Sequence, residues 1–139
     1  MTSLFTPKGF LMGGGVVLVL IAILGYVGVI GPTAEQSIFG AFWYFDNAEN
    51  IAHLVLGVVA LLAVYVLSSG MQKWLVLIIG AVAVLVGLYN FGSTELFGAN
   101  LESPADMLLH LVVGAWALYA GMSKSSMSMG ETPVGMGGM

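Results

Sequence analysis

The sequence predicts an all-α integral membrane protein, a four-helix bundle built from two repeated helical hairpins with the N and C termini in the cytoplasm. Three observations lead to this fold class: long apolar runs, a scarcity of charge and an internal repeat. The chain of 139 residues is 59% hydrophobic and only 7% charged, whereas a soluble domain carries about a quarter charged residues. The outer surface of the protein must therefore face lipid.

Four apolar runs supply the membrane spans, at 10–30, 51–67, 74–89 and 107–120. Runs of about 20 residues cross a bilayer as helices, and shorter runs do so when flanking polar residues reach the interface. The runs are continuous and do not alternate, which excludes a transmembrane barrel. We expect helices at about 10–30, 47–68, 73–90 and 104–121, which together form one domain over 10–121.

The internal repeat relates the second helix to the fourth. Residues 48–61 and 105–118 carry the same residue at seven of fourteen positions. His53 and His110, the two histidines of the chain, occupy equivalent places, and Glu49 stands opposite Asp106. An internal repeat indicates repeated structural units. Here each unit is expected to be a helical hairpin that carries one carboxylate and one imidazole.

The charges indicate how the hairpins lie in the membrane. Lys8, Lys73 and Lys124 all fall on the side of the two termini, whereas six of the seven acids fall in the other two connections or at the helix entries that follow them. The positive-inside rule therefore predicts a multi-pass protein of the plasma (inner) membrane with both termini cytoplasmic. The absence of a basic patch argues against a nucleic-acid partner, and the absence of Cys excludes thiolate chemistry.

The first span is expected to follow a short cytoplasmic leader, residues 1–9. Its apolar run is too long for a signal peptide, so a retained helix is favoured. The connection 31–46 then carries an aromatic cluster that is typical of a membrane–water boundary, with docking of another subunit or a pigment as the alternative. This cluster comprises Phe39, Phe42, Trp43, Tyr44 and Phe45.

The second and fourth helices have recognisable start signals. Asp46 followed by Glu49 resembles a capping box. Ser103, Pro104 and Asp106 read as a cap residue, a first-turn proline and a first-turn acid. Between them, Ser68-Ser69-Gly70 is expected to end the second helix.

The C-terminal segment 122–139 is rich in Met, Gly and Ser and has no apolar period. We expect it to be a disordered tail. Its Met127-Ser128-Met129 spacing would suit Cu(I), but a cytoplasmic location favours copper capture poorly.

Two carboxylate–histidine pairs are the candidate site. Glu49 and His53 are four residues apart, as are Asp106 and His110, so each pair lies on one helix face. Ionisable residues within a span usually face the bundle interior and indicate function. Gly57 and Gly114 follow the histidines by one turn and are expected to leave space beside each imidazole.

Several uses of this site remain open. His53 and His110 suit the axial ligation of haem, ligation of a chlorophyll-type pigment, or, together with Glu49 and Asp106, a divalent metal. The same residues can also simply fix helix packing. Ion or proton passage is disfavoured, because no charged residue continues a relay at mid-membrane. Motifs for Ser/His/Asp catalysis, phosphate loops and metalloproteases are absent from the sequence, so no enzyme is expected.

The motifs around the two histidines resemble those of a known family. Asn50-Ile51-Ala52-His53-Leu54, followed by Gly57, and Ala105-Asp106-Met107-Leu108-Leu109-His110-Leu111 are similar to the motifs of the bacterial four-helix membrane family catalogued as domain of unknown function 4383. Met107 stands where that family carries Asn. The resemblance covers about 10–121 and implies the four-helix topology and the paired histidines. It implies no activity.

The function expected from the sequence is that of a non-catalytic membrane protein, an accessory or scaffold subunit of a larger membrane complex. Its partners would be the lipid bilayer and other membrane subunits, or further copies of itself. The alternatives are a haem-, chlorophyll- or metal-binding protein that uses His53 and His110, and a small ion or metal transporter.

Overall fold

Four long helices make up the fold. The computed structural model describes residues 3–124, and the Met-rich motif of the tail, Met127-Ser128-Met129, lies outside them. The helices are α1 (Pro7–Tyr26), α2 (Asn47–Val66), α3 (Ser69–Asn90) and α4 (Ala105–Met122). Each is long and apolar enough to cross a membrane. The prediction of an all-helical, multi-pass membrane protein is confirmed at this level.

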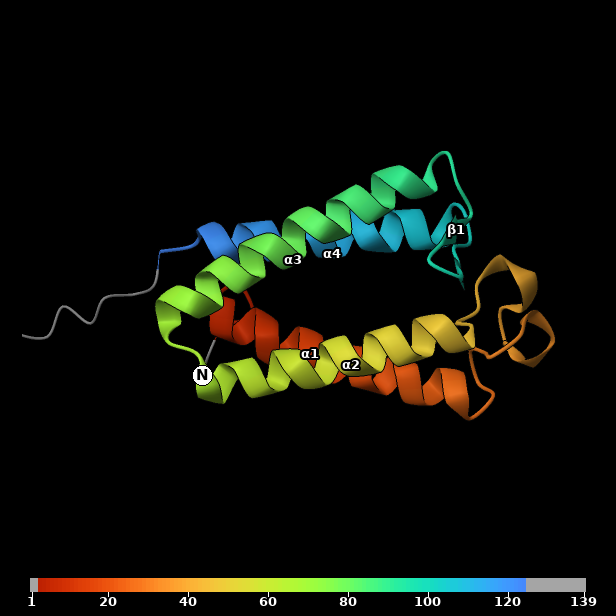
Figure 1. The fold of residues 1–139 in the computed structure, drawn as a ribbon, viewed down its shortest axis with the longest axis horizontal. Helices are drawn as coiled ribbons and strands as arrows, with labels where there is room; N and C mark the ends of the chain where they lie inside the picture. Colours follow the sequence, from red (N-terminus) through yellow and green to blue (C-terminus); the bar gives the residue numbers. More distant parts are fainter. Residues whose placement is uncertain (1–2, 125–139) are drawn as a thin grey trace, which may run out of the picture.

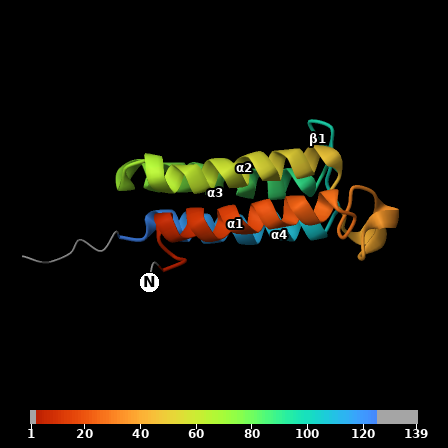
Figure 2. The same cartoon turned by 90° about the horizontal axis from the view of Figure 1, so that it is seen from below.

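The helices pack in two pairs. Helix α1 lies along α2, and α3 lies along α4; the perpendicular view places α1 with α4 in one layer and α2 with α3 in the other (Figure 2). The two pairs diverge toward the end that carries the connections 27–46 and 91–104 (Figure 1). We call this end the loop end, and the other the lysine end, because Lys8, Lys73 and Lys124 lie there.

Glycines bring the two helices of each pair into close contact. A Cβ atom added at Gly57 would lie 2.9 Å from the carbonyl oxygen of Gly15, and one at Gly114 would lie 3.1 Å from that of Gly80. Small residues allow backbones to approach in this way in membranes, where packing contacts drive helix association.

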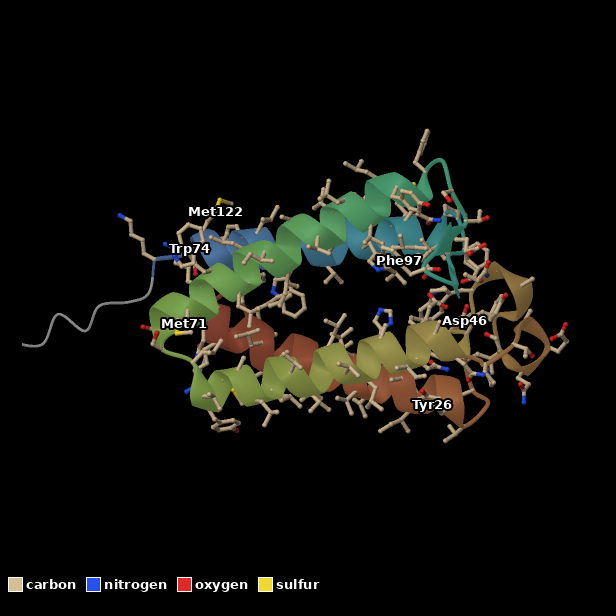
Figure 3. The ribbon with its side chains drawn as sticks, viewed as in Figure 1. Tyr26, Asp46, Met71, Trp74, Phe97 and Met122 are labelled. Carbon is tan, nitrogen blue, oxygen red and sulfur yellow. The ribbon has the colours of Figure 1, made fainter. Side chains whose placement is uncertain are left out.

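The interior differs between the two ends. The apolar core lies toward the lysine end and includes Phe10, Leu11, Val64, Val76 and Ala117. Most of the buried polar side chains lie toward the loop end instead: Ser37, Glu49, Asn50, Asn90, Glu102 and Asp106. Exposed Met71, Trp74 and Met122 mark the lysine end in Figure 3, opposite Asp46 and Phe97.

Helix α1 begins and ends earlier than the predicted 10–30. The hydroxyl of Thr6 caps it by accepting from the Gly9 N–H, and Pro7 takes the first helical position, as is common at N-termini. At the other end Gly28 adopts φ +81°, the left-handed conformation that ends many helices. Val29 and Ile30 are therefore outside the helix although they continue the apolar run.

The remaining boundaries show one confirmed start signal and three corrections. Asp46 and Glu49 form the predicted capping box at the start of α2. Ser68, which was expected inside the second helix, instead caps α3, so α3 starts at Ser69 and not at 73. In α4 Pro104 occupies the cap position without a side-chain bond, so Ser103 is not the cap, and Met122 belongs to the helix and not to the tail.

Short elements complete the loop end. They are the 3-10 turns η1 (Ala34–Gln36) and η2 (Gly40–Phe42) and a hairpin of β1 (Glu95–Leu96) and β2 (Ala99–Asn100). The hairpin pairs Glu95 with Asn100 and Leu96 with Ala99. The backbone N–H of Asn100 donates to the Asp46 carboxylate over 2.7 Å, which ties the hairpin to the start of α2.

Candidate functional site

The two histidines lie together between the helix pairs. His53 on α2 and His110 on α4 have ring centroids 6.4 Å apart, with ring planes inclined at 55°. Both side chains are partly buried. The expectation that the two imidazoles meet inside the bundle therefore agrees with the structure.

Each imidazole is held by a backbone carbonyl. Nδ1 of His53 lies 2.8 Å from the Glu49 carbonyl oxygen, and Nδ1 of His110 lies 2.7 Å from that of Asp106. Because a carbonyl oxygen only accepts hydrogen bonds, this network assigns the proton of each neutral ring to Nδ1. Both Nε2 atoms then keep a free lone pair. Fixing of a ligating histidine through its other nitrogen is usual in metal sites.

The two carboxylates do not hydrogen-bond to the histidines that follow them by one turn. The Glu49 carboxylate accepts from the backbone N–H of Asp46 at 3.0 Å. That of Asp106 accepts from the Glu102 N–H at 2.7 Å and from the Trp43 indole at 2.9 Å. Helix-start and loop donors therefore occupy these carboxylates, and each ring turns to the carbonyl one turn back.

Glu49 and Asp106 meet a third acid. Ligand atoms of Glu49, Glu102 and Asp106 all lie within 4.8 Å of one another. Their side chains are 3%, 8% and 1% exposed. Neither histidine belongs to this group, so the four residues predicted as one metal site fall into two neighbouring groups. We call these the carboxylate cluster (Glu49, Glu102, Asp106) and the histidine pair (His53, His110).

Loop residues hold Glu102 in place. The amide Nδ2 of Asn100 donates to Glu102 Oε1 and also lies 3.0 Å from the Tyr44 hydroxyl. The other oxygen, Glu102 Oε2, is buried and has no hydrogen-bond partner. Buried polar atoms without partners are rare and call for an explanation.

The local electrostatics favour a neutral Glu102 in the absence of a cation. Burial, and secondarily the neighbouring Asp106 carboxylate, raise the pKa of Glu102 to about 8. Burial and then the charge of Glu102 also raise the pKa of Tyr44 above its ordinary value. All three lysines lie at the lysine end, so no lysine compensates the cluster within residues 3–124.

The aromatic cluster is divided between two environments. Phe45 is only 3% exposed and stacks edge-on against His53, with ring centroids 5.0 Å apart. Trp43 packs against Phe45, and its indole N–H donates a hydrogen bond to the Asp106 carboxylate. Phe39 and Phe42 are exposed, as expected of residues at a membrane boundary. The interpretation of all five aromatics as boundary residues therefore fails for Phe45, which forms a wall of the histidine pair.

Gly57 and Gly114 do not provide open space beside the imidazoles. A side chain at Gly57 would meet Val19 and the backbone of Gly15, and one at Gly114 would meet Val84 and Gly80. The other helix of each pair fills this volume, so the two glycines serve helix packing.

Glu102, Trp43 and Asn100 were not predicted as site residues. Glu102 had a usable signal, since it is an acid only four residues before Asp106, in the connection that leads into α4. Trp43 and Asn100 carried no such signal, because their contacts bridge residues far apart in the chain.

Comparisons with protein-family models, with curated proteins and with solved structures find no match. The resemblance to domain of unknown function 4383 stays a prediction. The arrangement offers two kinds of ligand at the loop end, imidazole nitrogen and carboxylate oxygen.

Proposed function

We propose that this membrane protein binds a transition-metal ion between Nε2 of His53 and Nε2 of His110. The observation that carries the proposal is the 6.4 Å spacing of the two rings. Two imidazoles that bind one ion from opposite sides, each with a metal–nitrogen distance of about 2.1 Å, place their centroids about 6 Å apart. The carbonyl-bound Nδ1 atoms leave both Nε2 lone pairs available.

The donor set indicates the class of metal. Imidazole nitrogen suits zinc, copper, iron and nickel, whereas carboxylate sites suit harder ions. Phe45 shields one side of His53, which limits water at the site. A bare ion fits better than the iron of haem or the magnesium of a chlorophyll-type ring, because the helix faces at Gly57 and Gly114 are filled.

Metal analysis and an absorption spectrum of the full chain, purified from its native membrane, test this function. We expect a bound transition metal that His53→Ala and His110→Ala each remove. Met71→Ala is the matched control, because it deletes an exposed sulfur donor at the lysine end. A porphyrin or chlorin absorption band would identify a macrocycle as the bound form. A metal-free, colourless protein that also fails to take up added Cu²⁺, Zn²⁺ or Co²⁺ would exclude the proposal.

An accessory role in a larger membrane complex is the second candidate. Its support is the set of large apolar side chains exposed on the connections of the loop end, including Ile38, Phe42 and Phe97 at 71%, 64% and 99% exposure. Gentle solubilisation followed by native electrophoresis and mass spectrometry tests it. Migration as a single chain without partner subunits would count against it.

We also propose that both termini are cytoplasmic in the plasma membrane and that the two helix pairs arose by duplication. The positions of Lys8, Lys73 and Lys124 support the orientation, and the matched residues of 48–61 and 105–118 support the duplication. The chain has no Cys, so Gly92→Cys and Ser123→Cys each introduce a unique label site. An impermeant maleimide applied to whole cells should label only the Gly92 variant, and labelling of Ser123→Cys would reverse the orientation.

A further inference from the structure

We propose that Glu49, Glu102 and Asp106 bind one divalent cation of the size of Ca²⁺, which joins the two helix pairs at the loop end. The three carboxylates come from α2, from the segment after β2 and from the first turn of α4. Their ligand atoms lie within 4.8 Å of one another. This site is distinct from the histidine pair, and its ligands are all oxygen.

The first support is a buried carboxylate oxygen of Glu102 that lacks a hydrogen-bond partner. Glu102 is 8% exposed, yet its Oε2 has no hydrogen-bond partner. The other oxygen is bound by Asn100, which fixes the direction of the carboxylate. Leaving a buried polar atom unpaired is costly, because the atom loses its hydrogen bonds to water and gains none in the protein. A cation between the three carboxylates supplies the missing partner.

The second support is the charge balance. When ionised, the three carboxylates carry like charges that are taken out of water together, and buried charges normally require a counter-ion. The three lysines all lie at the lysine end. A bound cation therefore supplies the counter-charge that no lysine provides within residues 3–124.

The ligand spacing and the all-oxygen ligand set suit a hard divalent cation. Ca²⁺–oxygen distances of 2.3–2.6 Å place opposite ligand atoms about 4.6–5.2 Å apart, whereas the 2.0–2.1 Å distances of Mg²⁺ place them about 4.0–4.2 Å apart. The ligand atoms all lie within 4.8 Å of one another, a limit that both ions meet. The flexible coordination geometry of Ca²⁺, in contrast to the strict octahedron of Mg²⁺, suits three carboxylates from different segments. Oxygen-only ligands likewise favour a hard cation over the metals that prefer imidazole.

The cluster has a route from solvent. An open pocket at the loop end is lined by residues that include Tyr44, Asn100, Glu102 and Ser103. Of the three acids, Glu102 is the one that lines this pocket, so an ion coming from the aqueous side meets it first. An ion can therefore enter from the aqueous side, as a binding site requires.

Calcium titration of the full chain in phosphatidylcholine nanodiscs tests the proposal. We expect one Ca²⁺ per chain and a rise in the thermal unfolding midpoint on binding. Glu102→Gln and Glu49→Gln should each weaken binding at least tenfold. Glu35→Gln and Glu95→Gln remove the same charge from exposed positions on the loop-end connections and should leave binding unchanged.

Equal binding by all four variants, or no binding by the wild type at millimolar Ca²⁺, would overturn the proposal. Tighter binding of Mg²⁺ than of Ca²⁺ would overturn the assignment of the ion's size.

Terbium luminescence gives a second measurement of the same site that does not depend on the carboxylate variants. The Trp43 indole is bonded to Asp106, so Tb³⁺, a hard-ion substitute for Ca²⁺, should luminesce when Trp43 is excited. Trp43→Phe should abolish this signal, and Trp74→Phe at the lysine end should retain it. Loss of the signal in Trp74→Phe alone would contradict the site. His53→Ala should keep calcium binding, so this proposal and the histidine-pair function fail independently.

Discussion

The indole Nε1 of Trp43 donates a 2.9 Å hydrogen bond to Oδ1 of Asp106. Trp43 belongs to the connection between α1 and α2, and Asp106 to the first turn of α4. The bond therefore links the two helix pairs where their axes diverge. A second such link runs from the Asn100 N–H to the Asp46 carboxylate at 2.7 Å. The loop end is thus joined by polar contacts, whereas the lysine end is joined by an apolar core.

Loss of the indole donor should destabilise the loop end. Trp43→Phe keeps an aromatic ring but leaves one Asp106 oxygen without its donor. We expect a cost of about 1–3 kcal/mol, the usual penalty for leaving a buried acceptor unpaired. Thermal unfolding in detergent micelles measures it. Trp74→Phe, at a residue 67% exposed, should leave the midpoint unchanged, and equal midpoints for the two variants would refute the link.

A methyl group at Gly57 or Gly114 should weaken the helix pairs. At Gly57 the added Cβ would lie 2.9 Å from the Gly15 carbonyl oxygen and 3.0 Å from the Val19 nitrogen, and backbone atoms cannot move away cheaply. Overpacking of this kind costs about 1–3 kcal/mol. Gly70→Ala is the control, because nothing lies within 4 Å of its added Cβ. Unfolding midpoints should fall for Gly57→Ala and Gly114→Ala and stay level or rise for Gly70→Ala.

The tip of the β-hairpin should tolerate, or gain from, a change of Phe97. This residue is 99% exposed and has φ +52°, a left-handed conformation that costs most L-residues about 1–2 kcal/mol. Asn adopts it readily, and Asn-Gly is a preferred hairpin turn. Phe97→Asn should therefore unfold at the same temperature or higher.

The same Phe97→Asn variant reports on the accessory role. If Phe97 contacts a partner subunit, the variant should lose co-purifying protein while keeping its stability. A clear drop in its own unfolding midpoint would instead show that the Phe97 ring stabilises the isolated chain.

Stability without bound cation should fall as pH rises. Burial, followed by the effect of Asp106, raises the pKa of Glu102 from 4.5 to about 8, so between these values the folded protein holds a proton that the unfolded chain releases. The contribution of this group is therefore fully present below pH 4.5 and is lost as the pH approaches 8. Thermal unfolding in EDTA from pH 5 to 8.5 should show this decline, and Glu102→Gln should flatten it. A wild-type stability that increases over this window would contradict the assignment.

The sequence predicted some local features well. The capping box of Asp46 and Glu49 formed as expected because both of its bonds lie within four residues. The first helix was predicted to end at residue 30, but α1 ends at Tyr26. The apolar pattern continues to Ile30, whereas the backbone turns at Gly28. Hydrophobicity reports the environment of a segment, and it does not report where its helical hydrogen bonds end.

The candidate site was predicted in part. His53 and His110 meet as the repeat predicted. However, the carboxylates beside them turn to Glu102, Trp43 and Asp46, and the glycines face the other helix of each pair. These outcomes depend on rotamers and on neighbours from other segments, which spacing along one helix does not specify.

Composition and apolar run length by themselves determined that this chain forms four helices long and apolar enough to cross a membrane, because backbone polar groups in lipid must be satisfied within each span. Local spacing determined the start of α2 and placed one histidine in each of two helices. Only the tertiary structure decided that Glu49, Glu102 and Asp106 converge. The reason is physical: their approach requires α2, α4 and two connections to fold over one another, and such long-range contacts leave no periodic signal in the sequence.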